Sequence, residues 1–398
     1  WLTAQLFGVV AKNGESYESP LIVEDSLSDT LPEMDMEVEI RDGVAIDPVT
    51  RTAEEKKKFD LELLVAGTTF PLTFELLVLQ KKKADLLNAL AVALGGLERG
   101  EIGIGRRKRR GFGRCRVEKW EVCRYDLTTP QGLVSWLAGE DGEKKEGTPI
   151  HQLLGVADSA LPLDRRRYFT IKATFSLDGS LLIRYEPGEP DAPDMVHLHS
   201  KRRGKKEPVP VLSGASLAGA LRARALRIAN TLLPEEKATA LVEDLFGPRP
   251  VDEREKGQLK ASRLLVEEAV IGEPLELVQS RVKIDRFTGG SYPAALFSEQ
   301  PVFGTARTKV TIEIRLLQPL DRDIGLLLLL LKDLWTGDLP LGGEAGIGRG
   351  RLRGVEAELV YHGDQERKWE FVQEEGNLNI TGDIKRLEDF VRALKEEQ

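Results

Sequence analysis

The sequence predicts an α+β protein made of two ferredoxin-like domains in tandem, and two observations support this fold class. The segments expected between residues 166 and 362 follow the order strand, helix, strand, strand, helix, strand, which is the ferredoxin-like order. Most features of residues 1–128 recur in that region, in the same order and at a nearly constant spacing. Because the repeat is this long, its unit is a whole domain rather than a short solenoid repeat.

In the first domain, residues 1–128, the predicted elements correspond only to the later part of the fold. The alanine-rich run from residue 84 to 94 favours a helix, because its apolar residues are too continuous for a surface strand. The other expected elements are a helix-like or turn segment ending at residue 8 and strands at 21–25, 62–67, 70–79 and 114–125. The chain therefore enters this domain halfway, without an opening strand, loop and helix.

A linker is expected from residue 129 to 165, and the second domain follows it. Alternation from Tyr168 to Tyr185, broken at Asp178-Gly179, indicates a hairpin. A polar loop at 186–207 leads to a helix that Ser213 caps. Further helices are expected at 324–334 and, in a C-terminal tail at 363–398, at 383–397, where five apolar residues share one side. These five are Ile384, Leu387, Phe390, Val391 and Leu394.

Composition limits the functional classes. The 398 residues suffice for two or three domains, and 41% hydrophobic with 31% charged residues is typical of a soluble protein. No stretch approaches the roughly 20 apolar residues of a membrane span, no signal peptide is recognised after Trp1, and Cys115 and Cys123 form no zinc motif. We expect an intracellular protein in a reducing compartment.

The charge is segregated along the chain. A net charge of −8 argues against a uniformly basic protein, yet seven of the eleven residues from Arg106 to Arg116 are basic, as are five of the six from Lys201 to Lys206. This distribution predicts one basic track on an acidic body, which suits a phosphate backbone.

A glycine and arginine loop occurs twice, at Gly103–Gly111 and at Gly346–Gly354. Glycines allow backbone amides to approach a partner closely, and arginines supply fixed positive charge. Such loops suit a phosphate backbone, although a tight turn with solvated charges would have the same composition. The duplication favours the functional interpretation.

The helix start Ser213-Gly214-Ala215-Ser216-Leu217-Ala218-Gly219-Ala220-Leu221-Arg222, followed by a glycine and arginine loop before the last strand, resembles the RAMP superfamily. These are ferredoxin-like proteins of CRISPR effector complexes, and both copies look closest to backbone subunits of type III complexes in tandem-fusion form. Ser213 replaces a family proline and Ala218 a family lysine. The resemblance implies a subunit of an antiviral ribonucleoprotein of the prokaryotic cytoplasm. Such a subunit binds guide RNA (crRNA), holds its duplex with complementary target RNA and contacts other effector subunits.

The resemblance also implies which residues contact RNA. Two hairpin insertions, or thumbs, are expected at 41–59 and 279–302, where Phe287 and Tyr292 would stack on bases or anchor the hairpin, and where we interpret Asp47 and Asp285 as structural. The predicted RNA-binding residues are Gly105, Arg106, Arg107, Lys108, Arg109, Arg110, Arg114, Lys201, Arg202, Arg203, Ser213, Gly214, Ser216, Arg222, Gly348, Arg349, Arg351 and Arg353.

Three hypotheses about chemistry remain open. Asp194, or its neighbour Asp191, matches the loop aspartate with which many type III backbone subunits cut target RNA, so it would hold a divalent metal, Mg²⁺, and position the reacting 2′-hydroxyl. The chain could instead be a purely structural RNA-binding subunit. The third hypothesis is a metal-independent, guide-processing ribonuclease that uses His197 or His199, although the alternation of these histidines equally fits a strand edge facing solvent.

Overall fold

The computed structural model describes residues 2–10, 16–28, 38–47, 50, 52–140, 142–188, 190–248 and 260–395. Contacts between residues divide the chain into two compact units. Unit 1 comprises Trp1–Thr30, Thr69–Lys108 and Phe112–Asp164, and unit 2 comprises Leu31–Thr68, Arg109–Gly111 and Arg165–Gln398. The hairpin expected in the first domain and the end of the first glycine and arginine loop are thus grouped with unit 2. No helix in the part of the chain described by the structure is long and apolar enough to cross a membrane.

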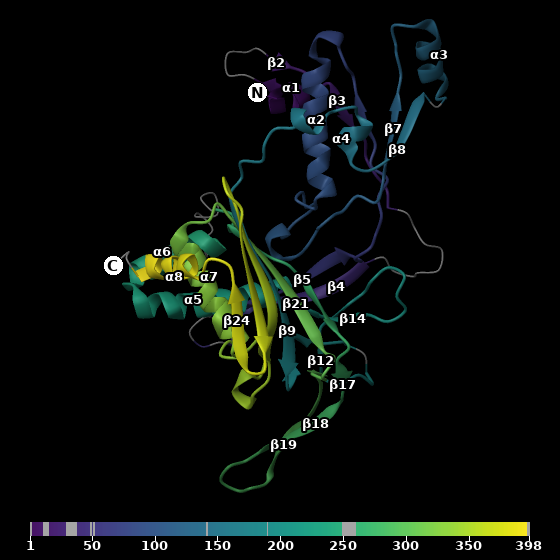
Figure 1. Cartoon of the computed structure of the whole chain (residues 1–398). Coiled ribbons are helices and arrows are strands. Elements are labelled where there is room, and N and C mark those ends of the chain that lie inside the picture. Colours follow the sequence, from purple (N-terminus) through teal and green to yellow (C-terminus); the bar gives the residue numbers. More distant parts are fainter. Residues whose placement is uncertain are drawn as a thin grey trace. The chain divides into compact units, whose positions relative to one another are not determined.

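The centre of unit 2 is an antiparallel sheet with the ferredoxin-like connection order (Figure 1). Strand β9 lies between β21 and β22, and β21 pairs on its other side with β15 and β16. In chain order these elements are β9 (Tyr168–Asp178), α5 (Gly214–Leu232), β15 (Leu264–Val266), β16 (Ala269–Gly272), β21 (Lys309–Leu317), α7 (Asp321–Trp335) and β22 (Arg351–His362). The predicted βαββαβ order is confirmed.

Further elements extend this sheet at both edges. These are β13 (His199–Ser200) and β14 (Val209–Leu212) at one edge, and β23 (Arg367–Glu374) and β24 (Asn377–Thr381) at the other. Sequence analysis did not predict β23 and β24. The predicted C-terminal helix is present as α8 (Ile384–Lys395), which buries Leu387, Phe390 and Leu394 and leaves Ile384 exposed.

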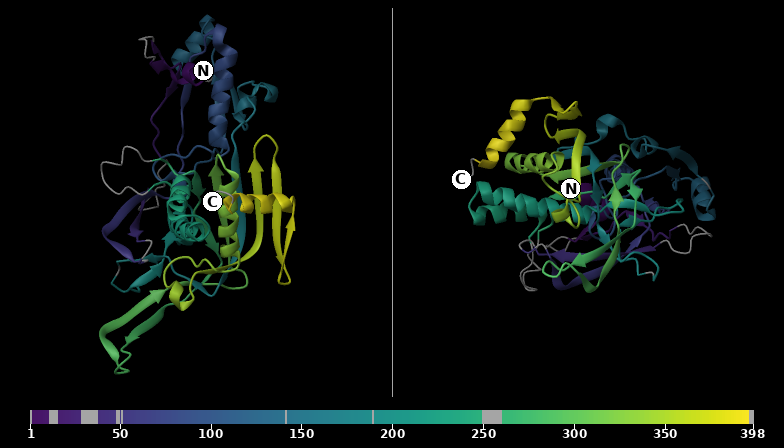
Figure 2. Two further views of the ribbon diagram at one scale, coloured as in Figure 1. Left: turned by 90° about the vertical axis from the view of Figure 1, so that its left-hand side faces the viewer. Right: turned by 90° about the horizontal axis from the view of Figure 1, so that it is seen from below.

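Four helices, α5, α6 (Glu235–Phe246), α7 and α8, lie together on one face of the sheet (Figures 1 and 2). Strand β9 supplies the facing core because its alternate residues point to the helices. They are Phe169, Ile171, Ala173, Phe175 and Leu177, all buried. Helix α7 can approach α8 closely because Gly325 has no side chain: a Cβ there would lie 2.1 Å from the carbonyl oxygen of Phe390.

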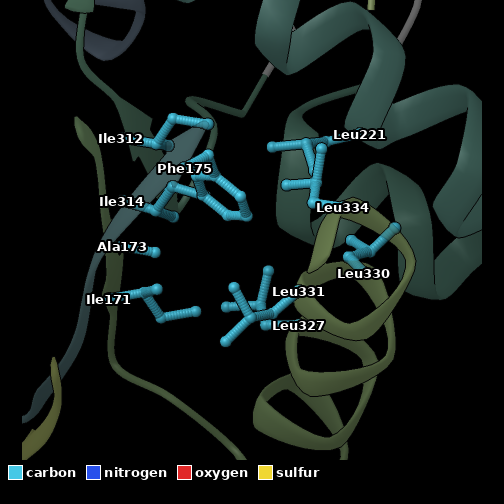
Figure 3. A pocket seen from close by; sticks show the side chains of 10 residues that line it. All are labelled: Ile171, Ala173, Phe175, Leu221, Ile312, Ile314, Leu327, Leu330, Leu331 and Leu334. Atoms are coloured by element: carbon cyan, nitrogen blue, oxygen red, sulfur yellow. The ribbon is translucent and has the colours of Figure 1, made fainter. Parts of the chain in front are cut away.

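A small cavity remains where α5 and α7 cover the sheet (Figure 3). Its volume is about 10 Å³. Its lining is entirely apolar and comprises Ile171, Ala173, Phe175, Leu221, Ile312, Ile314, Leu327, Leu330, Leu331 and Leu334. A water needs about this volume and polar partners as well. The cavity is therefore a packing defect and not a ligand site.

Unit 1 contains short pairs of strands rather than one sheet. Its elements are α1 (Leu2–Phe7), β1 (Val9–Val10), β2 (Ser16–Tyr17), β3 (Leu21–Val23), β6 (Phe74–Leu76), α2 (Lys83–Glu98), β7 (Trp120–Arg124), α3 (Pro130–Ala138), β8 (Glu143–Gly147) and α4 (Ile150–Leu153). Strand β3 pairs with β6 and β7 pairs with β8. Strands β21 and β22 of unit 2 correspond in the repeat to β6 and β7 of unit 1. They are joined through β9, for which the described residues of unit 1 offer no counterpart.

The core of unit 1 forms around α2 and Trp120. The indole nitrogen of Trp120 donates to Oε1 of Glu98 at 2.7 Å, and the same oxygen accepts a hydrogen bond from the backbone of Ile150 at 2.8 Å. The predicted helix at 84–94 is confirmed with longer bounds, whereas the strands expected at 70–79 and 114–125 shrink to β6 and β7. The strand expected at 114–125 begins later than predicted, because its first residues belong to the turn that ends the glycine and arginine loop.

Two long hairpins belong to unit 2. They are formed by β4 (Val38–Ile46) with β5 (Ala53–Leu64), and by β18 (Gln279–Ile284) with β19 (Ser291–Gln300). Smaller strands accompany them: β10 (Ser180–Leu181), β11 (Arg184–Tyr185), β12 (Met195–His197), β17 (Leu275–Glu276) and β20 (Val302–Phe303). The hairpin predicted at Asp178-Gly179 is wrong in its pairing, because β10 pairs with β20 instead of folding back on β9. Figure 1 shows the β18–β19 hairpin extending away from the sheet.

Candidate nucleic-acid interface

The first glycine and arginine loop exposes its central cations. The backbone of Ile104 donates to the carbonyl of Gly113 at 2.8 Å and closes the loop. Within it, Gly105 and Arg107 have positive φ angles of +82° and +56°. The side chains of Arg106, Arg107, Lys108 and Arg114 are exposed. The pKa of Arg107 is lowered by partial burial and by the neighbouring charge of Arg106, as expected where cations are gathered.

The end of that loop packs inside unit 2. Nη2 of Arg110 donates to the carbonyl of Phe246 at 3.2 Å, and Arg109 is half-buried, which lowers its pKa. A Cβ at Gly214 would lie 2.5 Å from the carbonyl oxygen of Arg110. Only glycine therefore lets Arg109–Gly111 lie on the first turn of α5.

The beginning of α5 is consequently interior. Ser213 is buried, and its hydroxyl accepts a hydrogen bond from the backbone of Ala215 at 3.2 Å, which is a helix cap. Ser216 is half-buried, and Nη1 of Arg222 donates to the carbonyl of Gly247 at 2.6 Å. Of the residues predicted to bind RNA here, Ser213, Gly214 and Arg222 make contacts that stabilise the fold.

The second glycine and arginine loop differs from the first, because its leading arginine is buried. Arg349 is 3% exposed; its Nη2 lies 3.1 Å from Oε2 of Glu299, and its Nε lies 3.2 Å from Oε2 of Glu344. Arg281 contacts the same two carboxylates at 3.2 and 3.3 Å. Burial, and then the carboxyl of Glu344, raise the pKa of Glu299. Arg349 thus faces carboxylates and not solvent, and we remove it from the proposed phosphate contacts.

This ionic cluster joins the second loop to the base of the β18–β19 hairpin. Gln279 and Arg281 lie on β18, Glu299 on β19, and Nη2 of Arg349 also donates to Oε1 of Gln279 at 2.9 Å. Farther along, Arg351 and Arg353 are exposed, and Nε of Arg353 donates to Asp178 at 3.0 Å. A positive φ of +93° at Gly348 makes the turn between Ile347 and Arg349 possible.

Asp194 lies just before β12 and is held by β19. Its Oδ2 accepts hydrogen bonds from the backbone and the hydroxyl of Ser298, at 2.7 and 3.1 Å. The backbone bond from Ser298, followed by the hydroxyl bond, lowers the pKa of Asp194. The carboxylate is therefore ionised at neutral pH and exposed. Asp191 lies at an exposed turn three residues earlier.

The residues around Asp194 could hold a metal only together with ligands from RNA and water. In the part of the chain that the structure describes, no group of three or more histidine, cysteine or acidic residues is placed so that it could hold a metal ion. Mg²⁺ is commonly bound by one or two carboxylates together with substrate phosphates and waters. Asp194 could thus hold Mg²⁺ that RNA phosphates and waters share, but these residues do not form an all-protein metal site.

The two histidines are part of the fold. His197 is fully buried: its Nδ1 accepts from the backbone of Ile183 at 3.2 Å, and its Nε2 lies 3.1 Å from the carbonyl of Val211. Burial, together with the charge of His199, lowers the pKa of His197 to about 4. His199 is half-buried, with Nε2 2.9 Å from Oε1 of Glu276. His197 therefore has no surface from which to reach RNA.

The base of the β4–β5 hairpin holds the basic segment Lys201–Lys206. Oε2 of Glu39 accepts a hydrogen bond from the backbone of Lys201 at 2.7 Å. Arg41 pairs with both Glu39 and Glu268, and Nη2 of Arg202 donates to Oε1 of Glu268 at 3.0 Å.

Arg202 is thus turned towards Glu268, whereas Lys205 and Lys206 are exposed and Lys201 and Arg203 half-buried. Sequence reasoning missed Glu39 and Arg41. Their signal was alternation: charged residues at positions 39 and 41 flank Ile40, so they share one face of a strand.

The remaining predicted residues lie at or near the turns of the two long hairpins. Oδ1 of Asp47 accepts from the backbone of Thr50 at 2.6 Å, and Oδ1 of Asp285 accepts from the backbone of Phe287 at 2.7 Å. Both aspartates therefore shape turns. Phe287 is 100% exposed and does not anchor its hairpin, whereas Tyr292 is half-covered, with Nζ of Lys283 4.8 Å from its ring centre.

Comparison with known proteins agrees with the sheet order and the duplication. The family model of the RAMP superfamily matches residues 2–116 and 194–353, one region in each repeat. Comparison with curated proteins finds no match. Since the two matched regions cover more than half of the chain, the chain belongs to the RAMP superfamily, whose members are RNA-binding subunits of multi-subunit CRISPR ribonucleoprotein complexes.

Proposed function

We propose that this chain is a guide-RNA-binding backbone subunit of a type III CRISPR effector complex, and that it cleaves target RNA at Asp194. The observation that carries the proposal is the position of this carboxylate. Asp194 is exposed and ionised, and Ser298 fixes it at the root of a projecting hairpin whose turn carries the fully exposed Phe287. The carboxylate is thereby bound to the hairpin that carries the aromatic ring.

Binding would rest on the exposed cations of the first loop and of the Lys201–Lys206 segment. Arg106, Arg107 and Lys108 lie on a turn that contains glycine, so a phosphate backbone can approach the main chain as well as the charges. Phe287 would add stacking on a base, which is tolerant of sequence because every base has an aromatic face. Each of these groups would hold RNA without reading its sequence.

In the proposed cleavage, the target 2′-oxygen attacks the adjacent phosphorus while the bond to the 5′-oxygen breaks. The leaving 5′-oxygen takes a proton from water, and the proton of the 2′-hydroxyl passes to Asp194 or to water. The products are a 2′,3′-cyclic phosphate and a 5′-hydroxyl. The hydrogen bonds from Ser298 lower the pKa of Asp194, so it is a weak base and its main role would be to orient the hydroxyl. Mg²⁺ bound by Asp194 and the phosphate would stabilise the developing negative charge.

The test compares Asp194→Ala with Asp191→Ala in the assembled complex, with Mg²⁺ present. We expect Asp194→Ala to slow cleavage by about 100-fold or more while guide and target RNA still bind. Asp191→Ala should cut normally. Full cutting by Asp194→Ala would remove this residue from the mechanism, and loss of RNA binding would assign it a structural role instead.

A purely structural subunit is the second candidate, and one observation favours it. The bonds between Asp194 and Ser298 join the polar loop to β19, which a structural role would explain without chemistry. Asp194→Asn separates the two candidates, because asparagine keeps an oxygen that can accept from Ser298 but has no charge. A structural subunit would show unchanged RNA binding and no cleavage in either form.

A further inference from the structure

Helix α3 carries large apolar side chains that its own unit does not cover. It connects β7 to β8, and Figure 1 shows it at the outer end of that strand pair. None of its nine residues is buried. Leu133, Val134, Trp136 and Leu137 are 40, 61, 40 and 70% exposed. Exposed apolar residues gathered on one element mark an interaction site more often than residues scattered singly.

The helix is formed without any partner, because its two ends are capped. The hydroxyl of Thr129 accepts a hydrogen bond from the backbone of Gly132 at 3.1 Å, and Pro130 occupies the first turn. At the other end, Gly139 has a φ of +67°, and the backbone of Glu140 donates to the carbonyl of Ser135 at 3.0 Å. A partner therefore meets a preformed helix and need not order it.

The spacing of the apolar residues suits a groove. Leu133, Trp136 and Leu137 stand at positions i, i+3 and i+4, so they share one face of the helix. This is the spacing with which a helix inserts its anchors into an apolar groove of another protein. Tryptophan is also among the residues that most often dominate the binding energy of an interface.

The charge around α3 indicates the chemistry of the partner. Residues 126–143 include four acidic residues and no lysine or arginine. The four are Asp126, Glu140, Asp141 and Glu143. The cations on either side lie on β7 and β8, where Lys144 pairs with Glu121 and Glu146, and Lys145 pairs with Glu143. An RNA backbone would be repelled here, whereas lysine or arginine side chains around a groove would be attracted.

We propose that α3 is a docking helix for another protein subunit of the ribonucleoprotein, one with an apolar groove rimmed by lysine or arginine. Leu133, Trp136 and Leu137 would fill the groove, and Asp126 and Glu140, which flank the helix in sequence, would face its rim. RAMP proteins work in multi-subunit complexes, so other protein subunits are present where this chain acts. The proposal does not depend on cleavage at Asp194.

The test uses the complex purified from its own cells through a tag on this chain, with p-benzoylphenylalanine at position 134. Irradiation should cross-link one protein subunit, at a peptide with apolar residues and lysine or arginine close by. A cross-link to RNA, to a second copy of this chain, or to nothing would overturn the proposal.

Two substitutions on the same helix provide the quantitative arm. Leu137→Lys should lower the amount of the cross-linked subunit that co-purifies by about tenfold or more, and Gln131→Lys, on an exposed polar residue, should leave it unchanged. Neither variant should change the melting temperature, because α3 contributes no buried side chain. Equal recovery with Leu137→Lys would refute the docking role, as would equal losses in both variants.

Discussion

Lowering the pH from 7 to 5 should destabilise this protein through one buried side chain, His197. The ring lies in the core of unit 2, and its hydrogen bonds with Ile183 and Val211 fit the neutral form. Protonation would place a charge in this buried environment and convert the nitrogen that accepts from Ile183 into a donor. The folded state therefore resists the proton that the unfolded chain accepts.

The magnitude follows from the difference between the two pKa values. The pKa of His197 falls from 6.5 to about 4 on folding, mainly because of burial. Since the folded state binds the proton less well, this contribution is complete above pH 6.5 and is lost as the pH falls towards 4. The full loss amounts to about 3 kcal/mol, of which about 2 kcal/mol is lost by pH 5.

Urea unfolding at pH 7 and pH 5, followed by tryptophan fluorescence, measures this loss. Carboxylates also titrate in this range, so the decisive quantity is the difference between the wild type and His197→Gln. Glutamine can replace both hydrogen bonds, and the variant should lose about 2 kcal/mol less between the two pH values.

Equal pH dependence in the wild type and His197→Gln would refute the reasoning. It would mean that His197 has an ordinary pKa and enough access to water to act in catalysis. The metal-independent ribonuclease hypothesis would then regain a candidate.

Three further outcomes are expected. Replacing Arg106 and Lys108 with alanine should weaken RNA binding whatever the base sequence. RNA titrations at several salt concentrations should show a salt dependence that is flatter by about 0.7 log unit per lost phosphate contact. Arg349→Ala, by contrast, should lower stability to urea and leave the salt dependence unchanged if Arg349 binds only carboxylates. Glu39→Ala should destabilise the chain by about 1–3 kcal/mol in urea unfolding, because Arg41 keeps Glu268 but loses Glu39, and the backbone N–H of Lys201 loses the carboxylate that accepts from it; an effect below about 0.5 kcal/mol would mean that water replaces Glu39. Gly214→Ala should lower the melting temperature, at a loss of roughly 1–3 kcal/mol, since its Cβ would lie 2.5 Å from two carbonyl oxygens; an unchanged transition would contradict the close packing there.

The central fold could be predicted because it is encoded locally. Alternating apolar residues from Phe169 to Leu177 define a half-buried strand, and the apolar run of α7 defines a helix, without knowledge of any partner. The duplication then supplied the order of the later elements a second time. Strands β23 and β24 were missed because their apolar residues are few, and Trp369 and Phe371 become core residues only when β23 pairs with β22.

The candidate site was less predictable because the sequence does not show whether a charged side chain points to solvent or into the fold. Arg106 and Arg349 occupy equivalent places in the duplicated loop, yet one is exposed and the other is buried against Glu299. Glu299 is distant in sequence and approaches only because the hairpin returns to the sheet. Likewise, Arg202 sits in a run that looks solvated until the fold places Glu268 beside it.

The end of β19 connects these features more closely than their sequence positions suggest. Ser298 holds Asp194, and the next residue, Glu299, holds Arg349 of the second loop. Successive residues of a strand point to opposite faces, so β19 is fixed from both sides at the point where the hairpin leaves unit 2. A base stacked on Phe287 would therefore contact a hairpin whose base is held by these contacts. The carboxylate that we propose for cleavage is therefore bound to the same anchored hairpin that carries the aromatic ring that we propose for stacking, and loosening Glu299 should disturb both at once.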